Sequence, residues 1–268
     1  MKIESNIHGI IVPHIPILLA KEMNDQSSST IKALRDCGMR MQEWGVEAVV
    51  AVTTHWQTKE SFFIDNSLHH ESIMDNSGVQ GKSKYSVAGH PELANLLLQA
   101  GEKSLIYPSI GKYCANHTIA IPLQFMFPEG NIPIVPLSVS GSMLCAFRWG
   151  RTLGNTLRSW RGKVLFLVLG AFSQRHARFM DDGWLIEHEN FDQLIVKLLS
   201  EGKGMELLTL DQERIENVKP KSAFLGLFML LGVMGSESPG YIRENEHLSY
   251  GGMRIIEFTD FQPSNVLH

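Results

Sequence analysis

Two histidines that each close an apolar, β-branched run are the residues of this chain best placed to do chemistry. His14 ends residues 9–14 (GIIVPH), and His55 follows residues 48–54 (AVVAVTT). Such runs, separated by a helical segment, are typical of buried strands in a βαβ unit, whose strands lie parallel in one sheet. Because α/β proteins bind ligands at the carboxyl edge of the sheet, both imidazoles are expected there. Two converging ring nitrogens would form half of a metal site.

Two other segments carry polar groups that could join this site. His117 opens an apolar segment, and its imidazole is either an acid/base or substrate-binding group, or a helix-start histidine bonded to backbone. Ser173 to His176 (SQRH) follows an apolar run at 163–170, so it belongs at the same edge, as site residues or as a polar loop. The remaining histidines predict less: His90 is expected to cap a helix, and the polar surroundings of three others predict solvated side chains (His69, His70 and His188).

The elements that must position these residues alternate between strands and helices. We expect strands at 8–13, 47–54, 132–139, 163–170 and 252–258, and helices at 27–44, 91–98, 143–158, 185–201 and 220–234. Residues 61–90 are polar and predict a long loop with a short strand at 62–64, and the prolines of 132–139 favour an edge or irregular strand. The alternation predicts a three-layer α/β/α fold with a central, mostly parallel sheet.

Composition bounds the class of protein. The chain has 268 residues and no linker-like segment, which predicts a single domain over 1–268. A net charge of −4 without a basic cluster argues against nucleic acid and anionic membranes as partners. Three scattered cysteines argue against a disulfide framework and fit a reducing compartment, and the longest apolar stretch, 223–234, is too short to span a bilayer. We therefore expect a cytoplasmic protein.

Taken in order, the motifs of this chain resemble those of the class III (LigB-type) extradiol dioxygenases, which open catechol-like rings with a mononuclear non-haem Fe(II). The resemblance covers a core of about residues 8 to 258. Its matching pieces are PHIP at 13–16, THW at 54–56, YSVAGHPELA at 85–94, NHT at 116–118, IVPLS at 134–138 and the closing segment 251–258.

The resemblance implies roles for individual residues. His14 and His55 match the iron ligands, with another divalent metal as an alternative, and His117 matches a residue that lines the substrate pocket. A carboxylate completes a 2-His-1-carboxylate face in this family, and Glu216 is the nearest carboxylate to the matching position, several residues early.

The chain departs from the family where an acid/base histidine normally follows a serine after the strand at 163–170. Gln174 stands there, which makes it a substrate-binding candidate. His176, two residues on, is the nearest imidazole and the candidate for proton transfer.

Three functions stay open at this point. The first is an Fe(II)-dependent ring-cleaving dioxygenase that uses O₂ and a catechol- or 2-aminophenol-like substrate. The second is a non-catalytic partner subunit of a heteromeric extradiol dioxygenase, and the third is a LigB-type protein repurposed for other metal-assisted chemistry. Retention of three histidines favours the first, whereas the displaced carboxylate and proton-transfer positions favour the others. By resemblance, we expect a homo-oligomer or a hetero-oligomer with a paralogous subunit.

Overall fold

The computed structural model describes residues 5–75, 82–101, 106–109, 117–170, 172, 182–211, 215, 223–248 and 251–259. Its elements, in chain order, are β1 (Ile7–Val12), α1 (Ile17–Met23), α2 (Ser29–Trp44), β2 (Ala48–Gln57), β3 (Phe62–Asp65), β4 (His69–Asp75), β5 (Lys82–Ala88), α3 (Pro91–Ala100), β6 (Ile106–Ser109), α4 (His117–Met126), β7 (Ile134–Val139), α5 (Met143–Ser159), β8 (Val164–Leu169), α6 (Asp182–Ser200), the 3-10 helix η1 (Gly204–Thr209), α8 (Ala223–Met234), β9 (Gly240–Leu248) and β10 (Gly251–Thr259).

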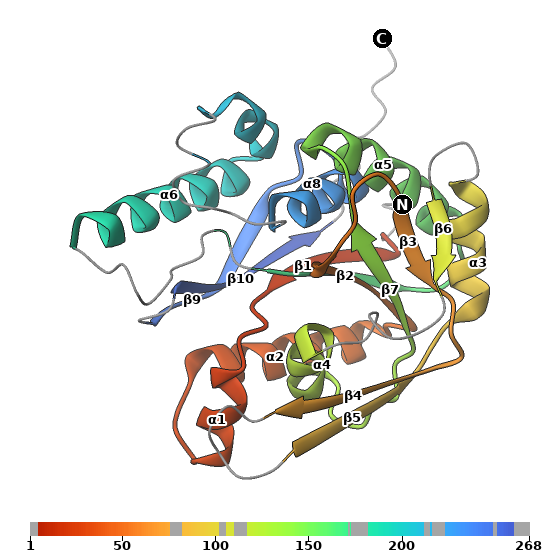
Figure 1. The fold of residues 1–268 in the computed structure, drawn as a ribbon, viewed down its shortest axis with the longest axis horizontal. Coiled ribbons are helices and arrows are strands. Elements are labelled where there is room, and N and C mark those ends of the chain that lie inside the picture. Colours follow the sequence, from red (N-terminus) through yellow and green to blue (C-terminus); the bar gives the residue numbers. More distant parts are fainter. Residues whose placement is uncertain are drawn as a thin grey trace.

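An eight-stranded sheet of order β6-β3-β7-β2-β8-β1-β10-β9 forms the middle layer (Figure 1). The central strands β7, β2, β8 and β1 are parallel, whereas β3 runs antiparallel to β7 and β10 antiparallel to β1. Helices α1, α2 and α4 cover one face, and α3, α5, α6 and α8 cover the other (Figure 1). The predicted three-layer fold is confirmed.

The central strands are apolar on both sides because both faces of the sheet are covered. Successive side chains of a strand point to opposite faces, so β2 serves two cores. Val50 and Val52 join the core under α5 and α8, while Val49 and Ala51 join the core under α2 and α4. This explains why the run at 48–54 shows no alternation of polar and apolar residues. No helix in the described part of the chain has the length and hydropathy needed to cross a membrane.

Helices α5 and α8 cross at very short range because glycines face the partner backbone. A Cβ on Gly150 would lie 2.1 Å from the carbonyl oxygen of Met229, and one on Gly232 would lie 2.2 Å from that of Phe147. Only glycine fits at such contacts. The crossing fixes the position of the end of α8 against α5.

Two helices begin at residues whose side chains cap them. Ser28 caps α2, since its hydroxyl accepts a hydrogen bond from the backbone N–H of Ile31. The expected cap at His90 is confirmed: its Nδ1 accepts from the N–H of Leu93 at 3.2 Å, at the start of α3.

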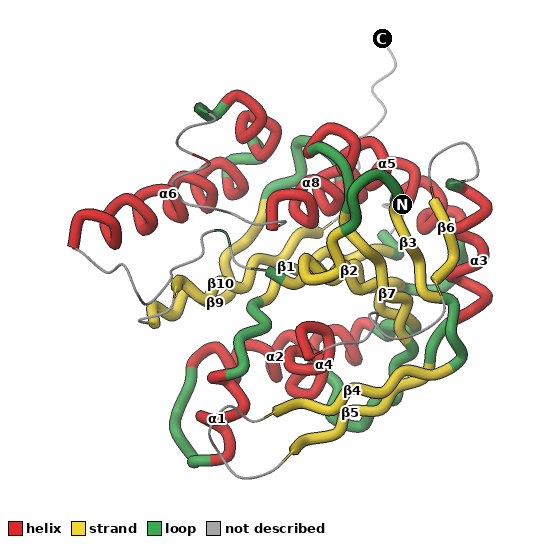
Figure 2. Tube along the Cα trace, viewed as in Figure 1, coloured by secondary structure: helices red, strands yellow, loops and turns green. Residues whose placement is uncertain are grey.

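The loop predicted at 61–90 is wrong beyond its short strand. Residues 69–75 and 82–88 form the antiparallel β4–β5 hairpin, which makes a second, two-stranded sheet (Figure 2). In β4 the buried positions are His70, Ser72 and Met74, alternating with exposed ones. The strand period is present, but polar residues occupy both faces, so the hydrophobic pattern concealed it.

Two smaller predictions are also wrong, and a third is right in one of its two alternatives. Strand β7 is internal, because it lies between β3 and β2, but its pairing is irregular, since its register with β2 shifts between Val52 and Gln57. Its Pro136 is tolerated where the pairing with β3 is sparse: β7 meets β3 at Leu137 and Ile64, and the next donor of β3, the N–H of Phe63, bonds to the Ser138 hydroxyl instead. The predicted solvation holds for the exposed His69, but two of those histidines are buried (His70 and His188).

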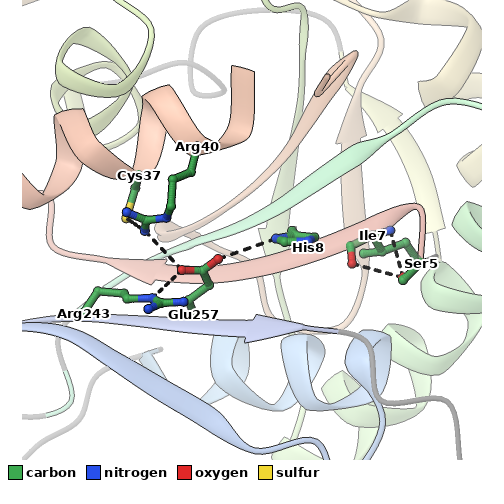
Figure 3. A network of polar contacts seen from close by, with 7 residues as sticks. All are labelled: Ser5, Ile7, His8, Cys37, Arg40, Arg243 and Glu257. Atoms are coloured by element: carbon green, nitrogen blue, oxygen red, sulfur yellow. Dashed lines mark hydrogen bonds and ion pairs between the residues drawn. The ribbon is translucent and has the colours of Figure 1, made fainter. Parts of the chain in front are cut away.

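A polar network around Glu257 joins α2 to the antiparallel end of the sheet (Figure 3). The buried Glu257 carboxylate accepts hydrogen bonds from Arg243 Nε at 2.6 Å and Arg40 Nη2 at 3.1 Å, and His8 Nδ1 lies 3.6 Å away. Arg40 also contacts Cys37 Sγ at 3.0 Å. We call Glu257, His8, Arg40 and Arg243 the Glu257 network.

Candidate active site

His14 and His55 meet at the carboxyl edge of the sheet, where their Nε2 atoms lie 3.2 Å apart. The strands that carry them are not neighbours, because β8 lies between β1 and β2. Val12 and Thr53 are both paired with Leu169 of β8, and each histidine comes two residues later. Pairing with a common strand therefore brings the two imidazoles to the same level.

His117 completes a group of three imidazoles. It is the first residue of α4, and its ring centroid lies 5.6 Å from that of His55 with an interplanar angle of 84°. The His14 and His55 rings lie 4.9 Å apart at 87°. We call His14, His55 and His117 the histidine cluster. His55 is exposed and the other two are partly exposed, so a small ligand can reach the cluster.

Two buried threonines connect the strand that carries His55 to the helix that carries His117. Thr53 Oγ1 and Thr118 Oγ1 lie 2.7 Å apart, and Thr53 Oγ1 accepts the backbone N–H of His55 at 3.3 Å. The contact therefore joins Thr53, two positions before His55 on β2, to Thr118, the residue after His117 in α4. Sequence reasoning missed both threonines, although each stands within two positions of a candidate histidine.

The environment keeps these imidazoles neutral. Burial, His55 and His117 together lower the pKa of His14 to about 3. Burial and the adjacent His117 lower the pKa of His55, and burial lowers that of His117. Neutral imidazole is the form that binds metal ions and that accepts a proton from a substrate hydroxyl.

The spacing of His14 and His55 fits a shared metal ion. Two nitrogens 3.2 Å apart, each about 2.1 Å from a metal as in zinc–imidazole sites, subtend an angle of about 100° at the ion. The same distance also suits a hydrogen bond from one imidazole to the other. Nδ1 of His14 is buried and has no hydrogen-bond partner within the described residues.

The third ligand predicted from the sequence is not placed. The described residues hold no group of three or more histidine, cysteine or carboxylate side chains arranged to bind a metal ion. Glu216, Gln174 and His176 lie outside the described residues. The described part of the chain therefore provides two converging imidazole nitrogens and a third imidazole beside them.

Comparison with known proteins adds to this geometry. A family model described as the catalytic LigB subunit of aromatic ring-opening dioxygenase matches residues 8–257. The chain is 22% identical over 270 residues to the 3,4-dihydroxyphenylacetate 2,3-dioxygenase of Escherichia coli, covering 89% of this chain and 96% of that one. It is 28% identical over 250 residues to the 4,5-DOPA dioxygenase extradiol of Beta vulgaris, covering 86% and 91%.

A solved structure shares the fold. The crystal structure of an uncharacterized protein of Escherichia coli K12 superposes with a TM-score of 0.69 at 16% identity, covering 93% of this chain and 98% of that one. The family match spans nearly the whole chain and includes all three residues of the histidine cluster. The chain belongs to the LigB family.

Proposed function

We propose that this protein is a non-haem Fe(II)-dependent extradiol-type dioxygenase that acts on a catechol- or 2-aminophenol-like ring. The observation that carries the proposal is the 3.2 Å approach of the His14 and His55 Nε2 atoms at the carboxyl edge of a LigB-family sheet. Two relatives named as dioxygenases of dihydroxylated aromatic compounds support it.

In this proposal His14 and His55 hold the metal through their neutral Nε2 atoms. Fe(II), when bound, supplies Lewis-acid and oxygen-activating chemistry. A carboxylate would complete the ligand set, and Glu216 is our candidate for it.

The chain's own proton chemistry falls to His117 and to the segment after β8. His117 lies beside His55, and its lowered pKa leaves its ring nitrogen free to accept a hydrogen bond or a proton from a ring hydroxyl bound there. Strand β8 ends between β1 and β2, the strands that lead to His14 and His55. We therefore assign Gln174 to substrate binding and His176 to proton transfer.

Anaerobic loading with Fe(II), followed by metal analysis and oxygen uptake with catechol and 2-aminophenol, tests the proposal. We expect close to one iron per chain and oxygen uptake with at least one of the two substrates. His14→Ala should lose both, whereas His69→Ala, which changes an exposed histidine on β4, should keep both. A chain that binds no iron and consumes no oxygen would contradict the proposal.

A second function, that of a partner subunit in a hetero-oligomer, is favoured by one residue of the chain. Gln174 occupies the position after Ser173 where the resemblance places an acid/base histidine, and an amide cannot exchange protons at neutral pH. In that case oxygen uptake would appear only when a catalytic paralogue is co-expressed. Iron binding without oxygen uptake in either setting would instead favour other metal-assisted chemistry.

A further inference from the structure

A cavity of about 520 Å³ lies between α5, η1 and the end of α8. Its lining includes Phe147, Arg151, Asn155 and Arg158 of α5, Met205 of η1 and Ser236, which follows α8. The four α5 residues are spaced by four, four and three positions, so they share one face of that helix. This cavity takes no part in the function proposed above.

The cavity is remote from the histidine cluster. Helix α8 runs along the sheet from Gly226, which lies against Val168 near the carboxyl end of β8, to Met234, which lies against Gly9 near the start of β1. The cavity is at the Met234 end, on the face covered by α5 and α8. The histidine cluster is at the opposite edge, on the face that carries α4. A ligand in one site therefore cannot touch the other.

The charge of the cavity is positive, although the protein as a whole carries −4. Arg151 and Arg158 line it, and no acidic residue is among the lining residues that the structure describes. Among the described residues, Arg151 forms no ion pair with an acidic side chain. An exposed guanidinium in a concave site is a ready partner for an anion, because its fork of donors matches the two oxygens of a carboxylate or phosphate.

Among the described contacts, carbonyl groups at the C-terminal end of α8 are bonded by groups other than Arg151. Two of its last four carbonyl groups accept hydrogen bonds from the residues that follow the helix: the N–H of Gly235 bonds to the carbonyl oxygen of Leu231 at 3.0 Å, and the Ser238 hydroxyl to that of Met234 at 2.7 Å. Arg158 Nη2 donates to the carbonyl oxygen of Val233 at 2.6 Å, which holds that side chain in place. Three of the last four carbonyl groups of the helix are thereby capped, and Arg151 takes no part in this capping among the described contacts.

We infer that this cavity binds a small organic oxyanion. Arg151 would pair with the carboxylate or phosphate group, and the fixed Arg158 would add a second positive charge. The Asn155 amide and Ser236 hydroxyl can donate further hydrogen bonds, while Phe147 and Met205 provide apolar surface for the body of the ligand. Benzoate and phenyl phosphate are matched probes for the two oxyanion types.

Isothermal titration of the iron-free protein at low ionic strength tests the inference. We expect benzoate, phenyl phosphate or both to bind, the tighter probe identifying the anion, and Arg151→Gln to weaken binding about tenfold or more through loss of charge-assisted hydrogen bonds. Benzamide, which keeps the ring but lacks the charge, should bind much more weakly. Arg161→Gln is the matched control, because Arg161 is exposed just beyond α5 and outside the cavity.

Several outcomes would overturn the inference. Equal weakening by Arg151→Gln and Arg161→Gln would show a response to overall charge only. Benzamide binding as tightly as benzoate would show that the cavity does not select an anion. Loss of binding in His55→Ala but not in Arg151→Gln would place the probe at the histidine cluster. None of these outcomes depends on oxygen uptake, so the inference and the proposed dioxygenase activity fail independently.

Discussion

The histidine cluster and the Glu257 network are both polar groups on the same face of one sheet, but they differ in the charges that surround their buried ionisable groups. Glu257 is surrounded by donors and positive charge, and Arg243, Arg40 and His8 satisfy its carboxylate. His14 instead faces two groups of its own kind, His55 and His117. The carboxylate of one cluster is paired within the protein, whereas the other cluster turns neutral imidazoles toward one another.

The pKa shifts of Glu257 and His14 reflect the same difference between the two clusters. Burial acts to raise the pKa of Glu257, but the nearby His8, the hydrogen bond from Arg243 and the charges of both arginines lower it to about 2, which favours the charged form. For His14, burial and the neighbouring imidazoles act together to disfavour the charged form. A carboxylate paired in this way stabilises a fold, whereas neutral, converging lone pairs are suited to a ligand.

The sharpest way to test this contrast is to remove one imidazole from the histidine cluster. His55→Ala should lower Fe(II) affinity by about 100-fold or more, because it deletes one of the two proposed nitrogen ligands, a larger loss than the 10–100-fold typical of groups that only support a ligand. Since His55 is exposed, the free energy of unfolding should change by less than about 1 kcal/mol. Metal titration and urea unfolding measure the two effects. A large loss of stability with unchanged iron affinity would reverse the assignment of this cluster.

The Glu257 network should respond in the opposite way. Glu257→Gln should lower the free energy of unfolding by about 2–3 kcal/mol, somewhat less than for a fully buried pair, because water can partly solvate the two arginines, whose side chains are 39% and 43% exposed. Iron affinity should be unchanged. Glu129→Gln, on an exposed turn, is the control in urea unfolding and should behave as the unchanged protein. Equal effects of the two changes would mean that the network contributes nothing to stability.

Acid should weaken the Glu257 network specifically. Its folded-state pKa of about 2 lies below the ordinary value of 4.5, so its stabilisation is complete above about pH 4.5 and is lost as the pH falls toward 2. The other groups of the network are His8, Arg40 and Arg243, and the Cys37 thiol lies beside Arg40. We expect the stability difference between the unchanged protein and Glu257→Gln, up to about 2–3 kcal/mol at pH 7, to shrink between pH 4.5 and pH 3. A difference that stays constant over this range would contradict the network as described.

A smaller effect tests whether the histidine cluster needs support from behind. Thr53→Val keeps the shape of the side chain but removes the hydroxyl that contacts Thr118 and the N–H of His55. We expect about tenfold weaker Fe(II) binding, as for other changes to groups that hold a metal ligand in place. Thr53→Ser should restore most of the affinity, since it returns the hydroxyl. If both variants bind iron equally, the threonine link does not position His55.

The sequence predicted those strands and helices in which the pattern of polar and apolar residues matches the burial of each position. Strand β8 was predictable because six apolar residues lie between two covered faces, and α2 because Ser28 caps an amphipathic helix. The β4–β5 hairpin was not, because polar residues such as His70 and Ser72 occupy its buried face. Strand β9 was missed for a similar reason: its sequence, GYIRENEHL, is rich in charge.

The site was predictable in part. The edge at which His14 and His55 meet follows from local strand patterns, but their actual spacing depends on β8, and nothing near either histidine in sequence indicates that partner. The contacts of Thr53 with Thr118 and of Glu257 with Arg40 join residues 65 and 217 positions apart. Such contacts come from tertiary packing, which periodicity does not encode.

The insertion of β8 between β1 and β2 has a consequence for how the protein matures. Both histidines proposed as metal ligands are made within the first quarter of the chain, yet the strand that sets their spacing comes much later, and the Thr54 hydroxyl bonds to the carbonyl oxygen of Leu169 across 115 positions. Contacts between such distant segments form late in folding, because a long stretch of chain must first be closed. A growing polypeptide therefore contains both imidazoles long before the sheet can hold them at the spacing that a metal ion needs. If the proposed metal site is correct, iron binding during folding would indicate that β8 has taken its place between β1 and β2.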